Sequence, residues 1–183
     1  ALAGFGTSPQ TGFPGEVGGR LRNPGTWREI EKVTMSYGYG LSVNLVQLAR
    51  AYTVFASDGE RKAATLMRTN GAVAGEPVFN SKTVSQIRKM LELAVESEKG
   101  TGQRARVVGY RVGGKTGTAK KSMNGRYVDG KYVGSFVGIA PMSNPRVVVA
   151  VMIDEPDSSP HKYYGGVVAA PAFSRITREA LRL

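Results

Sequence analysis

The 183-residue sequence has no cysteine and a single histidine. Without cysteine the chain forms no disulfide and offers no thiol nucleophile. His161 has no second imidazole to complete a histidine triad or a histidine-rich metal site, and turn-forming neighbours predict that it lies in an exposed loop. We expect neither a metal nor a cofactor. No apolar run approaches the ~20 residues of a membrane-spanning helix, and no signal peptide is visible.

Acidic residues are few, with 14 Asp and Glu against 25 Lys and Arg, a net charge of +11. Such an excess raises the possibility of a basic module that binds nucleic acid or anionic lipid. The cations are scattered in small groups such as Arg104/Arg106, without a helical stripe or an aromatic-interleaved RNA motif. We therefore expect a solvated surface facing anionic polymers, and no nucleic acid. Asp154 and Glu155, which end a strand, are expected to form ion pairs or caps rather than an acid–base pair.

Glycine and proline are concentrated near the N-terminus, and residues 1–32 are predicted to form an ordered loop segment. Apolar residues at helical spacing then predict three helices. The first begins with Ser42 as N-cap and ends at Asp58-Gly59, and the second extends from about Ser81 to Gly100. The third covers 170–183, with a predicted buried stripe of Phe173, Ile176, Ala180 and Leu181.

Between the second and third helices the pattern changes to that of strands. The predicted strands are Val107–Val112, Tyr132–Ile139 and Val147–Ile153. Asn124-Gly125 and Asp129-Gly130 are turn signals. The last strand is a continuous apolar run, which is typical of burial on both faces. A small hairpin is also predicted within 65–78. Helices before and after an antiparallel meander indicate an α+β fold, an antiparallel sheet covered by helices.

Lys115-Thr116-Gly117-Thr118 supports two incompatible interpretations. The segment from Gly109 to Thr116 fits the phosphate-loop template G-x-x-x-x-G-K-[ST], and residues 146–155 form an apolar strand ending in acid, as in nucleotide-binding enzymes. A phosphate loop requires a helix that opens at Lys115 and directs its N-terminus at the phosphates. No amphipathic period follows in residues 119–132, so we do not expect a P-loop nucleotide-binding site.

Lys-Thr-Gly-Thr is also the third signature of serine acyl-transfer enzymes that act on penicillin and D-alanyl peptides. On an edge strand beside a cleft, each residue has a chemical task. Gly117 lets a substrate backbone lie close to the strand, and the Thr118 backbone N–H can point at a developing oxyanion. Lys115 supplies a cation for a carboxylate or a proton relay. The hydroxyls of Thr116 and Thr118 can hold a substrate carboxylate.

Several separated segments extend this resemblance: Thr34–Leu41, Gln47–Tyr52, Gly113–Lys121, Phe136–Pro141, Ile153–Pro156 and Tyr163–Pro171. Together they resemble the transpeptidase domain of class B penicillin-binding proteins, above all the septal, cell-division members. The resemblance implies the penicillin-binding and serine β-lactamase-like fold, incomplete at its N-terminal side. Residues 1–183 would then be the C-terminal part of one transpeptidase domain.

The resemblance implies a peptidoglycan D,D-transpeptidase that cross-links stem peptides in septal wall synthesis and is acylated by β-lactam antibiotics. It implies membrane proteins of the divisome as partners, and a location on the periplasmic side of the bacterial inner membrane through an anchor outside this chain. Tyr163 and Tyr164, with Tyr132 as a weaker candidate, would form a wall of the substrate cleft, and Lys120 would contact substrate. A serine β-lactamase or penicillin-sensor domain of the same fold is the alternative.

In this family a nucleophilic Ser-x-x-Lys motif and a Ser-x-Asn motif both precede Lys-Thr-Gly. We expect no Ser-x-x-Lys motif in this chain, and no serine before Lys115 has a lysine at the required spacing. Ser42-Val-Asn44 and Ser122-Met-Asn124 match Ser-x-Asn by spelling only, because Ser42 is expected to cap a helix and Ser122 follows the Lys-Thr-Gly motif. We therefore expect no nucleophile in this chain, and both motifs upstream of Ala1.

Overall fold

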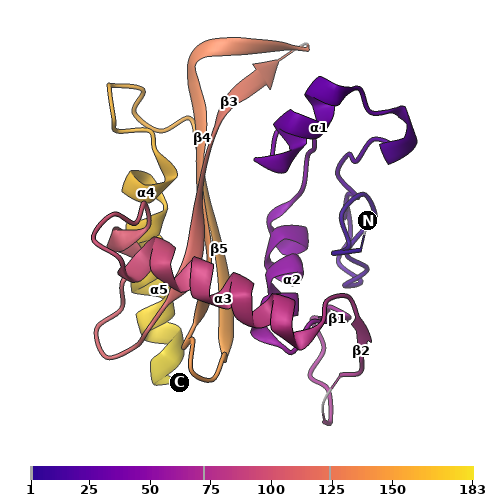
Figure 1. Cartoon of the computed structure of the whole chain (residues 1–183), viewed down its shortest axis with the longest axis vertical. Helices are drawn as coiled ribbons and strands as arrows, with labels where there is room; N and C mark the ends of the chain where they lie inside the picture. Colours follow the sequence, from indigo (N-terminus) through magenta and orange to yellow (C-terminus); the bar gives the residue numbers. More distant parts are fainter. Residues whose placement is uncertain (1, 72, 124) are drawn as a thin grey trace.

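The computed structural model describes residues 2–71, 73–123 and 125–183. Its centre is an antiparallel sheet of β3 (Gly113–Met123), β4 (Arg126–Ala140) and β5 (Val147–Asp154) in the order β3-β4-β5. β4 is the middle strand, and β3 and β5 are the two edges of the sheet within the described residues (Figure 1). The predicted α+β class and the antiparallel meander are confirmed.

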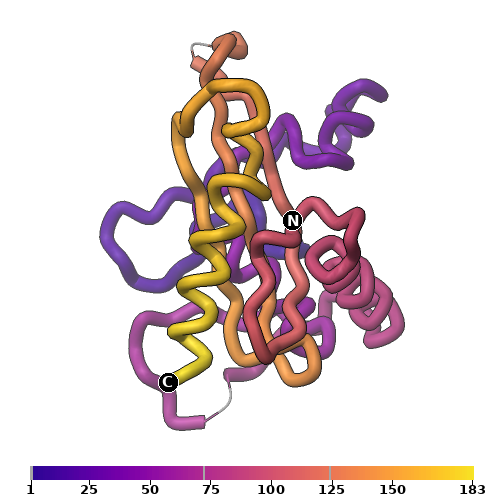
Figure 2. Tube along the Cα trace, turned by 90° about the vertical axis from the view of Figure 1, so that its left-hand side faces the viewer, coloured from indigo at the N-terminus to yellow at the C-terminus, as the bar shows by residue number. Residues whose placement is uncertain are grey.

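Helices cover both faces of this sheet (Figure 2). α5 (Ala170–Arg182) packs along one face against β4 and β5, and α2 (Leu45–Ala56) packs on the same two strands from the other side. α3 (Ser81–Glu96) packs against β3. The remaining elements are η1 (Pro24–Thr26), α1 (Glu29–Ser36), β1 (Glu60–Lys62), β2 (Gly75–Pro77), η2 (Gln103–Ala105) and α4 (Gly165–Val168).

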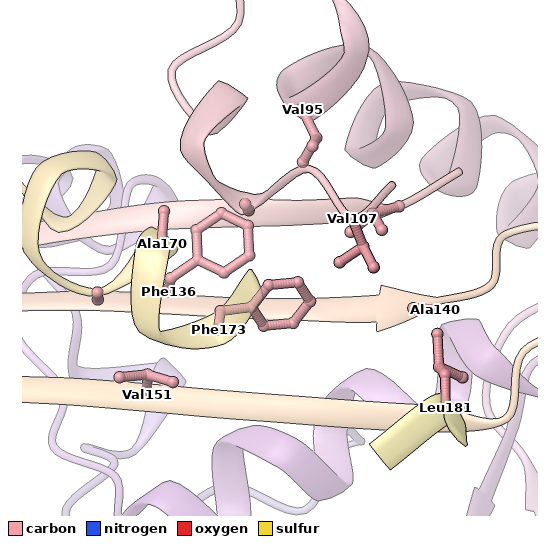
Figure 3. Packing of buried hydrophobic residues seen from close by; sticks show 11 residues of the cluster. Val95, Val107, Phe136, Ala140, Val151, Ala170, Phe173 and Leu181 are labelled. Atoms are coloured by element: carbon pink, nitrogen blue, oxygen red, sulfur yellow. The ribbon is translucent and has the colours of Figure 1, made fainter. Parts of the chain in front are cut away.

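Alternate residues of β4 fill the two sides of the core, because successive side chains of a strand point to opposite faces. Phe136 is fully buried toward α5, where its ring lies 4.7 Å from that of Phe173 (Figure 3). Ile139 is fully buried on the opposite side, against Leu91 of α3. Full burial of such a side chain contributes roughly 1.5–3 kcal/mol. The apolar run in β4 therefore holds both helical layers.

Two strand predictions need correction. β3 begins at Gly113, because Val107–Val112 turns back through a bridge between Val107 and Tyr110 before the sheet starts. Asp129-Gly130 is a bulge inside β4 rather than a chain reversal. Lys120 pairs with Tyr132 and Ser122 with Tyr127, so a longer piece of β4 opposes a shorter piece of β3. The positive φ of 74° at Gly130, which glycine adopts readily, suits this bulge.

Asn124, in the other predicted turn, lies outside the described residues. The third strand is covered on both faces as predicted, by α5 and α2, but most of its side chains are only partly buried. β5 is an edge strand, and in it only Val151 is buried, whereas Met152 is 48% exposed. A continuous apolar run therefore does not by itself distinguish a central strand from an edge strand.

The first long helix is capped by Asn44 rather than by Ser42. The Asn44 side chain accepts from the Gln47 backbone N–H at 2.8 Å, and the Gln47 side chain accepts from the Asn44 N–H at 3.0 Å, which makes a capping box. Gln47 is almost fully buried and also donates to the carbonyls of Thr7 and Gly18. One glutamine thus ties the glycine-rich N-terminal segment to α2.

The other helix and loop predictions are confirmed only in part. The loop predicted for 1–32 gives way to α1 at Glu29, and the hairpin predicted in 65–78 instead pairs β1, at 60–62, with β2. α3 buries Val84, Leu91 and Val95. α5 buries Phe173 and Leu181, but Ile176 is 50% exposed and Thr177 takes its place in the core.

Candidate active site

Lys115 to Thr118 lie on β3, at the free edge of the sheet. The Lys120 backbone N–H is directed at the Tyr39 hydroxyl at 3.4 Å, and the Thr116 carbonyl accepts from Lys115 Nζ at 3.0 Å. Both partners lie outside the β3–β4 ladder, so these peptide groups face away from β4. Along a strand, the N–H and C=O groups of every second residue point to the same side. The Thr118 N–H, midway between them, therefore also faces the free edge.

The phosphate-loop interpretation is wrong. β3 continues from Gly113 to Met123 through Lys115 and Thr116, and the next element in the described chain is the antiparallel strand β4. No helix opens at Lys115, so the N-terminal N–H groups that would hold phosphates are missing at the point where the motif needs them.

The two threonine side chains point to one face of β3, toward α4 and η2. Thr116 Oγ1 lies 3.1 Å from Thr101 Oγ1, and Thr118 Oγ1 accepts from the Gly165 backbone N–H at 3.0 Å. Because the Thr118 oxygen already accepts this bond, its own proton can be donated elsewhere. Both threonines line a pocket of about 380 Å³, which we call the threonine pocket. Thr101 and Tyr164 also line it.

Gly165 brings the start of α4 directly onto the backbone of β3 and β4. A Cβ at position 165 would overlap the carbonyl oxygens of Gly117 and Ser135, so only glycine fits. Gly117 has a similar constraint, because a Cβ there would overlap the Ser135 hydroxyl. Gly117 therefore serves the fold as well as the approach of a substrate. The close approach of Gly165 to the strand carbonyls brings its N–H beside Thr118.

Lys115 and the threonines use opposite faces of the strand. Lys115 pairs across the ladder with Val137, whereas Thr116 pairs with Phe136 on the α5 side. The Lys115 side chain is therefore outside the threonine pocket, but its exposed ammonium group turns to the free edge to reach the Thr116 carbonyl. The motif supplies a cation on one side of the edge and hydroxyl donors on the other.

The three tyrosines named from the sequence form one row. The rings of Tyr132 and Tyr163 stack with centroids 3.8 Å apart and planes 9° apart, and Tyr164 follows Tyr163 at 4.7 Å. Tyr164 is 42% exposed and lines the threonine pocket. The structure therefore brings Tyr132, Tyr163 and Tyr164 together beside Thr118, which is what a cleft wall requires.

Lys120 is held by the bulge in β4. Its ammonium group lies 2.8 Å from the carboxylate of Asp129. The hydrogen bond to Asp129 raises the pKa of Lys120, and the same bond lowers the pKa of Asp129. Lys120 is thus near the proposed site, but its charge is already paired in this structure.

Ion pairs beyond the site fasten the end of β3 to the other strands. Lys121 reaches Asp154 at 2.7 Å and Glu155 at 2.8 Å, and Lys131 reaches Glu155 at 3.1 Å. The hydrogen bonds to Asp154 and Glu155 raise the pKa of Lys121. The expectation that these carboxylates form ion pairs is confirmed. His161 is exposed in a loop, as expected.

Sequence reasoning missed three residues that the structure adds to this region. Thr101 and Arg104, from the segment after α3, line the threonine pocket, and Tyr39 reaches the edge at Lys120. Tyr39 lies in one of the segments that carry the family resemblance. Thr101 follows a glycine at the end of a helix, and nothing in its neighbours distinguishes it from an ordinary turn residue.

The expectation that the chain carries no Ser-x-x-Lys motif is wrong at the level of sequence, because Ser159-Pro-His-Lys162 has this pattern. Both side chains are engaged by Asp157. Ser159 Oγ donates to its carboxylate at 2.6 Å, and Lys162 lies 3.3 Å from it. The segment is a turn and not a helix, so Ser159 does not have the lysine one helical turn away on the same face.

Two further observations concern the described residues only. No three His, Cys, Asp or Glu side chains among them gather closely enough to hold a metal ion. A helix with the length and apolar character to cross a bilayer does not occur in this part of the chain either.

Comparisons with known proteins place the chain in a family. The family model "Penicillin binding protein transpeptidase domain" matches residues 2–178. The chain is 47% identical over 180 residues to the probable peptidoglycan D,D-transpeptidase PenA of Neisseria flavescens, covering 98% of this chain and 44% of that protein. It is 39% identical over 180 residues to the peptidoglycan D,D-transpeptidase FtsI of Escherichia coli K12, covering 98% of this chain and 30% of that protein.

Among solved structures, the transpeptidase domain of penicillin-binding protein 3 from Burkholderia pseudomallei superposes with a TM-score of 0.90. Its sequence is 52% identical, and the match covers 98% of this chain and 54% of that one. The chain therefore spans less than half the length of the two curated relatives and about half of the solved domain.

Proposed function

This chain belongs to the family of penicillin-binding-protein transpeptidase domains, and from that premise we propose that it is part of a peptidoglycan D,D-transpeptidase of septal wall synthesis. The observation that carries the proposal is the free edge of β3. There the Thr118 N–H, the threonine pocket and the Lys115 ammonium group converge on a strand that has no neighbour on that side in the described residues. An extended peptide can lie along such an edge.

The reaction is an acyl transfer in two steps. A serine from outside this chain attacks the carbonyl of a terminal D-Ala–D-Ala bond, D-alanine leaves, and an ester to the enzyme remains. The amine of a neighbouring stem peptide then displaces the serine oxygen and forms the cross-link. β-Lactams enter the first step in place of the peptide and stay bound as the ester.

Each residue of the edge has a role in these steps. The Thr118 N–H contributes one donor to the oxyanion hole, a contribution worth roughly 10²–10³ in rate in other enzymes. The hydroxyls of Thr116 and Thr118 bind the terminal carboxylate. Lys115 assists proton transfer from the other side of the edge. Gly117 permits close approach of the substrate backbone.

The substrate wall and the setting of the enzyme complete the proposal. Tyr132, Tyr163 and Tyr164 bound the cleft, and Lys120 contacts substrate after exchanging its Asp129 partner. Residues 1–183 form the C-terminal part of one transpeptidase domain. The enzyme works on the periplasmic side of the inner membrane, anchored by a segment outside this chain, with divisome membrane proteins as partners.

The acylation rate of the full-length protein tests this function. Lys115→Ala should lower the second-order rate constant for acylation by a fluorescent penicillin about 10²-fold or more, because it removes a group that moves a proton. Lys82→Ala removes an exposed lysine at the start of α3 that lies outside the proposed site, and it serves as the matched control. Circular dichroism checks the fold of both variants. If Lys115→Ala is acylated at the wild-type rate, the Lys-Thr-Gly segment is only a strand and the proposal fails.

A further inference from the structure

A cation without a counter-charge lines the threonine pocket. Arg104, in the short η2 turn after α3, shares this pocket with Thr116, Thr118 and Tyr164. Its side chain is exposed, and within the described residues no carboxylate lies at ion-pairing distance from it. Neighbouring Arg106, in contrast, pairs with Glu96 at 3.6 Å. The charge of Arg104 is therefore available to a ligand.

The other polar groups of the pocket agree with an anionic ligand. They are the hydroxyls of Thr101, Thr116, Thr118 and Tyr164 and the amide of Gln103. All of them can donate a hydrogen bond, and none of the described residues that line the pocket carries a carboxylate. The proposed function uses the Thr116 and Thr118 hydroxyls for a carboxylate. Arg104 adds a planar, permanently charged donor, and this group matches carboxylates better than any other side chain.

Two molecules present the same chemical group to this pocket in turn. The leaving group of the first step is D-alanine, an amine whose adjacent carbon carries a carboxylate. The acceptor of the second step must bring its amine to the same carbonyl carbon, along the path by which the D-alanine nitrogen departed. An acceptor amine with a carboxylate on its own α-carbon can reproduce the contacts of the leaving group.

We propose that Arg104 determines acceptor specificity by binding the carboxylate adjacent to the attacking amine in the threonine pocket. This inference rests on the proposed function. In the second step the amine nitrogen attacks the ester carbonyl, a C–N bond forms and the bond from the carbonyl carbon to the serine oxygen breaks. The nitrogen loses one proton and the serine oxygen regains one. Arg104 moves no proton. It orients the amine through its carboxylate, which raises the effective concentration of the correct geometry.

The second step can be measured separately through the ratio in which the acyl-enzyme reacts with competing acceptors. The full-length protein is acylated with a D-alanyl thioester whose thiol leaving group carries no carboxylate, so Arg104 is not needed for the first step. D-Alanine and D-alaninamide then compete with water as acceptors, and the product ratio gives each aminolysis rate relative to hydrolysis. The wild-type protein should prefer D-alanine. Arg104→Gln should reduce this preference about tenfold, the lower end for a hydrogen bond between charged groups, with the thioester acylation rate unchanged.

Two further variants separate local recognition from net charge and from damage to the fold. Arg104→Lys keeps the charge and should recover part of the preference for D-alanine. Lys99→Gln removes the same charge from an exposed neighbouring residue that does not line the pocket, and it should behave as wild type. An equal loss of preference in Lys99→Gln would overturn the assignment, because the effect would then be one of overall charge.

The remaining outcomes distinguish the two proposals. If the wild-type protein is not acylated by the thioester, the proposed transpeptidase function is wrong. If it is acylated, but Arg104→Gln retains the full preference for D-alanine over D-alaninamide, the function stands and the role of Arg104 is wrong.

Discussion

At the scale of single residues, the geometry of the site depends on positions where only glycine fits. Gly165 is the clearest case, because its N–H bonds the Thr118 hydroxyl while its Cα lies against the carbonyls of Gly117 and Ser135. In the full-length protein, Gly165→Ala should lower the free energy of unfolding by about 1–3 kcal/mol, the usual range for overpacking. It should also slow acylation by penicillin, because β3 must shift away from α4 and take Thr118 with it.

Gly25→Ala is the control for Gly165→Ala. A Cβ at position 25 would meet only the Asn23 side chain, at 3.4 Å, so its effects on stability and acylation should be small. Urea unfolding and the second-order acylation rate constant are measured for both variants. Unchanged values in Gly165→Ala would show that the start of α4 tolerates a side chain and does not position Thr118.

The contiguous part of the site could be predicted from the sequence, and the rest could not. Lys115 to Thr118 lie on one strand, so their spacing alone places them together. The sequence did not indicate that Lys115 and Thr116 face opposite sides, although the two-residue period of a strand requires it once the strand is known. Arg104 and Thr101 reach the pocket from another element. Only the packing of η2 beside α4 brings them there.

At the scale of elements, α5 shows which of its faces packs into the core. Phe173 is fully buried against Phe136, whereas Ile176 is 50% exposed although the apolar pattern predicted it inside. In the full-length protein, Phe173→Ala should cost about 3–5 kcal/mol of unfolding free energy. Ile176→Ala should cost less than about 1 kcal/mol, since little apolar area is lost from the interior. Urea unfolding measures the free energy of unfolding of both variants. A similar large loss of stability at both positions would contradict the described orientation of α5.

Element types were easier to predict than their exact limits, and the reasons are local. The spacing of Val84, Leu91 and Val95 determines α3, because one face must be apolar. The cap of α2 was misassigned because serine and asparagine are equally good N-caps, and the choice of Asn44 depends on its capping box with Gln47. Asp129-Gly130 is equally compatible with a turn and a bulge in the sequence, because glycine with positive φ suits both.

At the scale of the whole molecule, helices on both faces of the sheet (Figure 2) leave the edge of β3 accessible on one side within the described residues, and the proposed nucleophile comes from outside this chain. The only serine with a lysine at the required spacing is Ser159, and Asp157 engages both partners in a turn. A serine there has no free lysine to take its proton. The 183-residue chain alone should therefore form no covalent adduct with a fluorescent penicillin, whereas the full-length protein should be labelled.

Mass spectrometry of the intact chain after incubation with penicillin measures this prediction. Circular dichroism first confirms that the isolated chain retains its helices and strands, so that absence of labelling is not a consequence of unfolding. Ser159→Ala is the matched variant, and it should be indistinguishable from the unaltered chain. A stoichiometric acyl group that disappears in Ser159→Ala would identify Ser159 as the nucleophile. The second step of the reaction would then have to be rebuilt around the loop that precedes α4, with the tyrosine row rather than the free edge of β3 beside the reacting carbonyl.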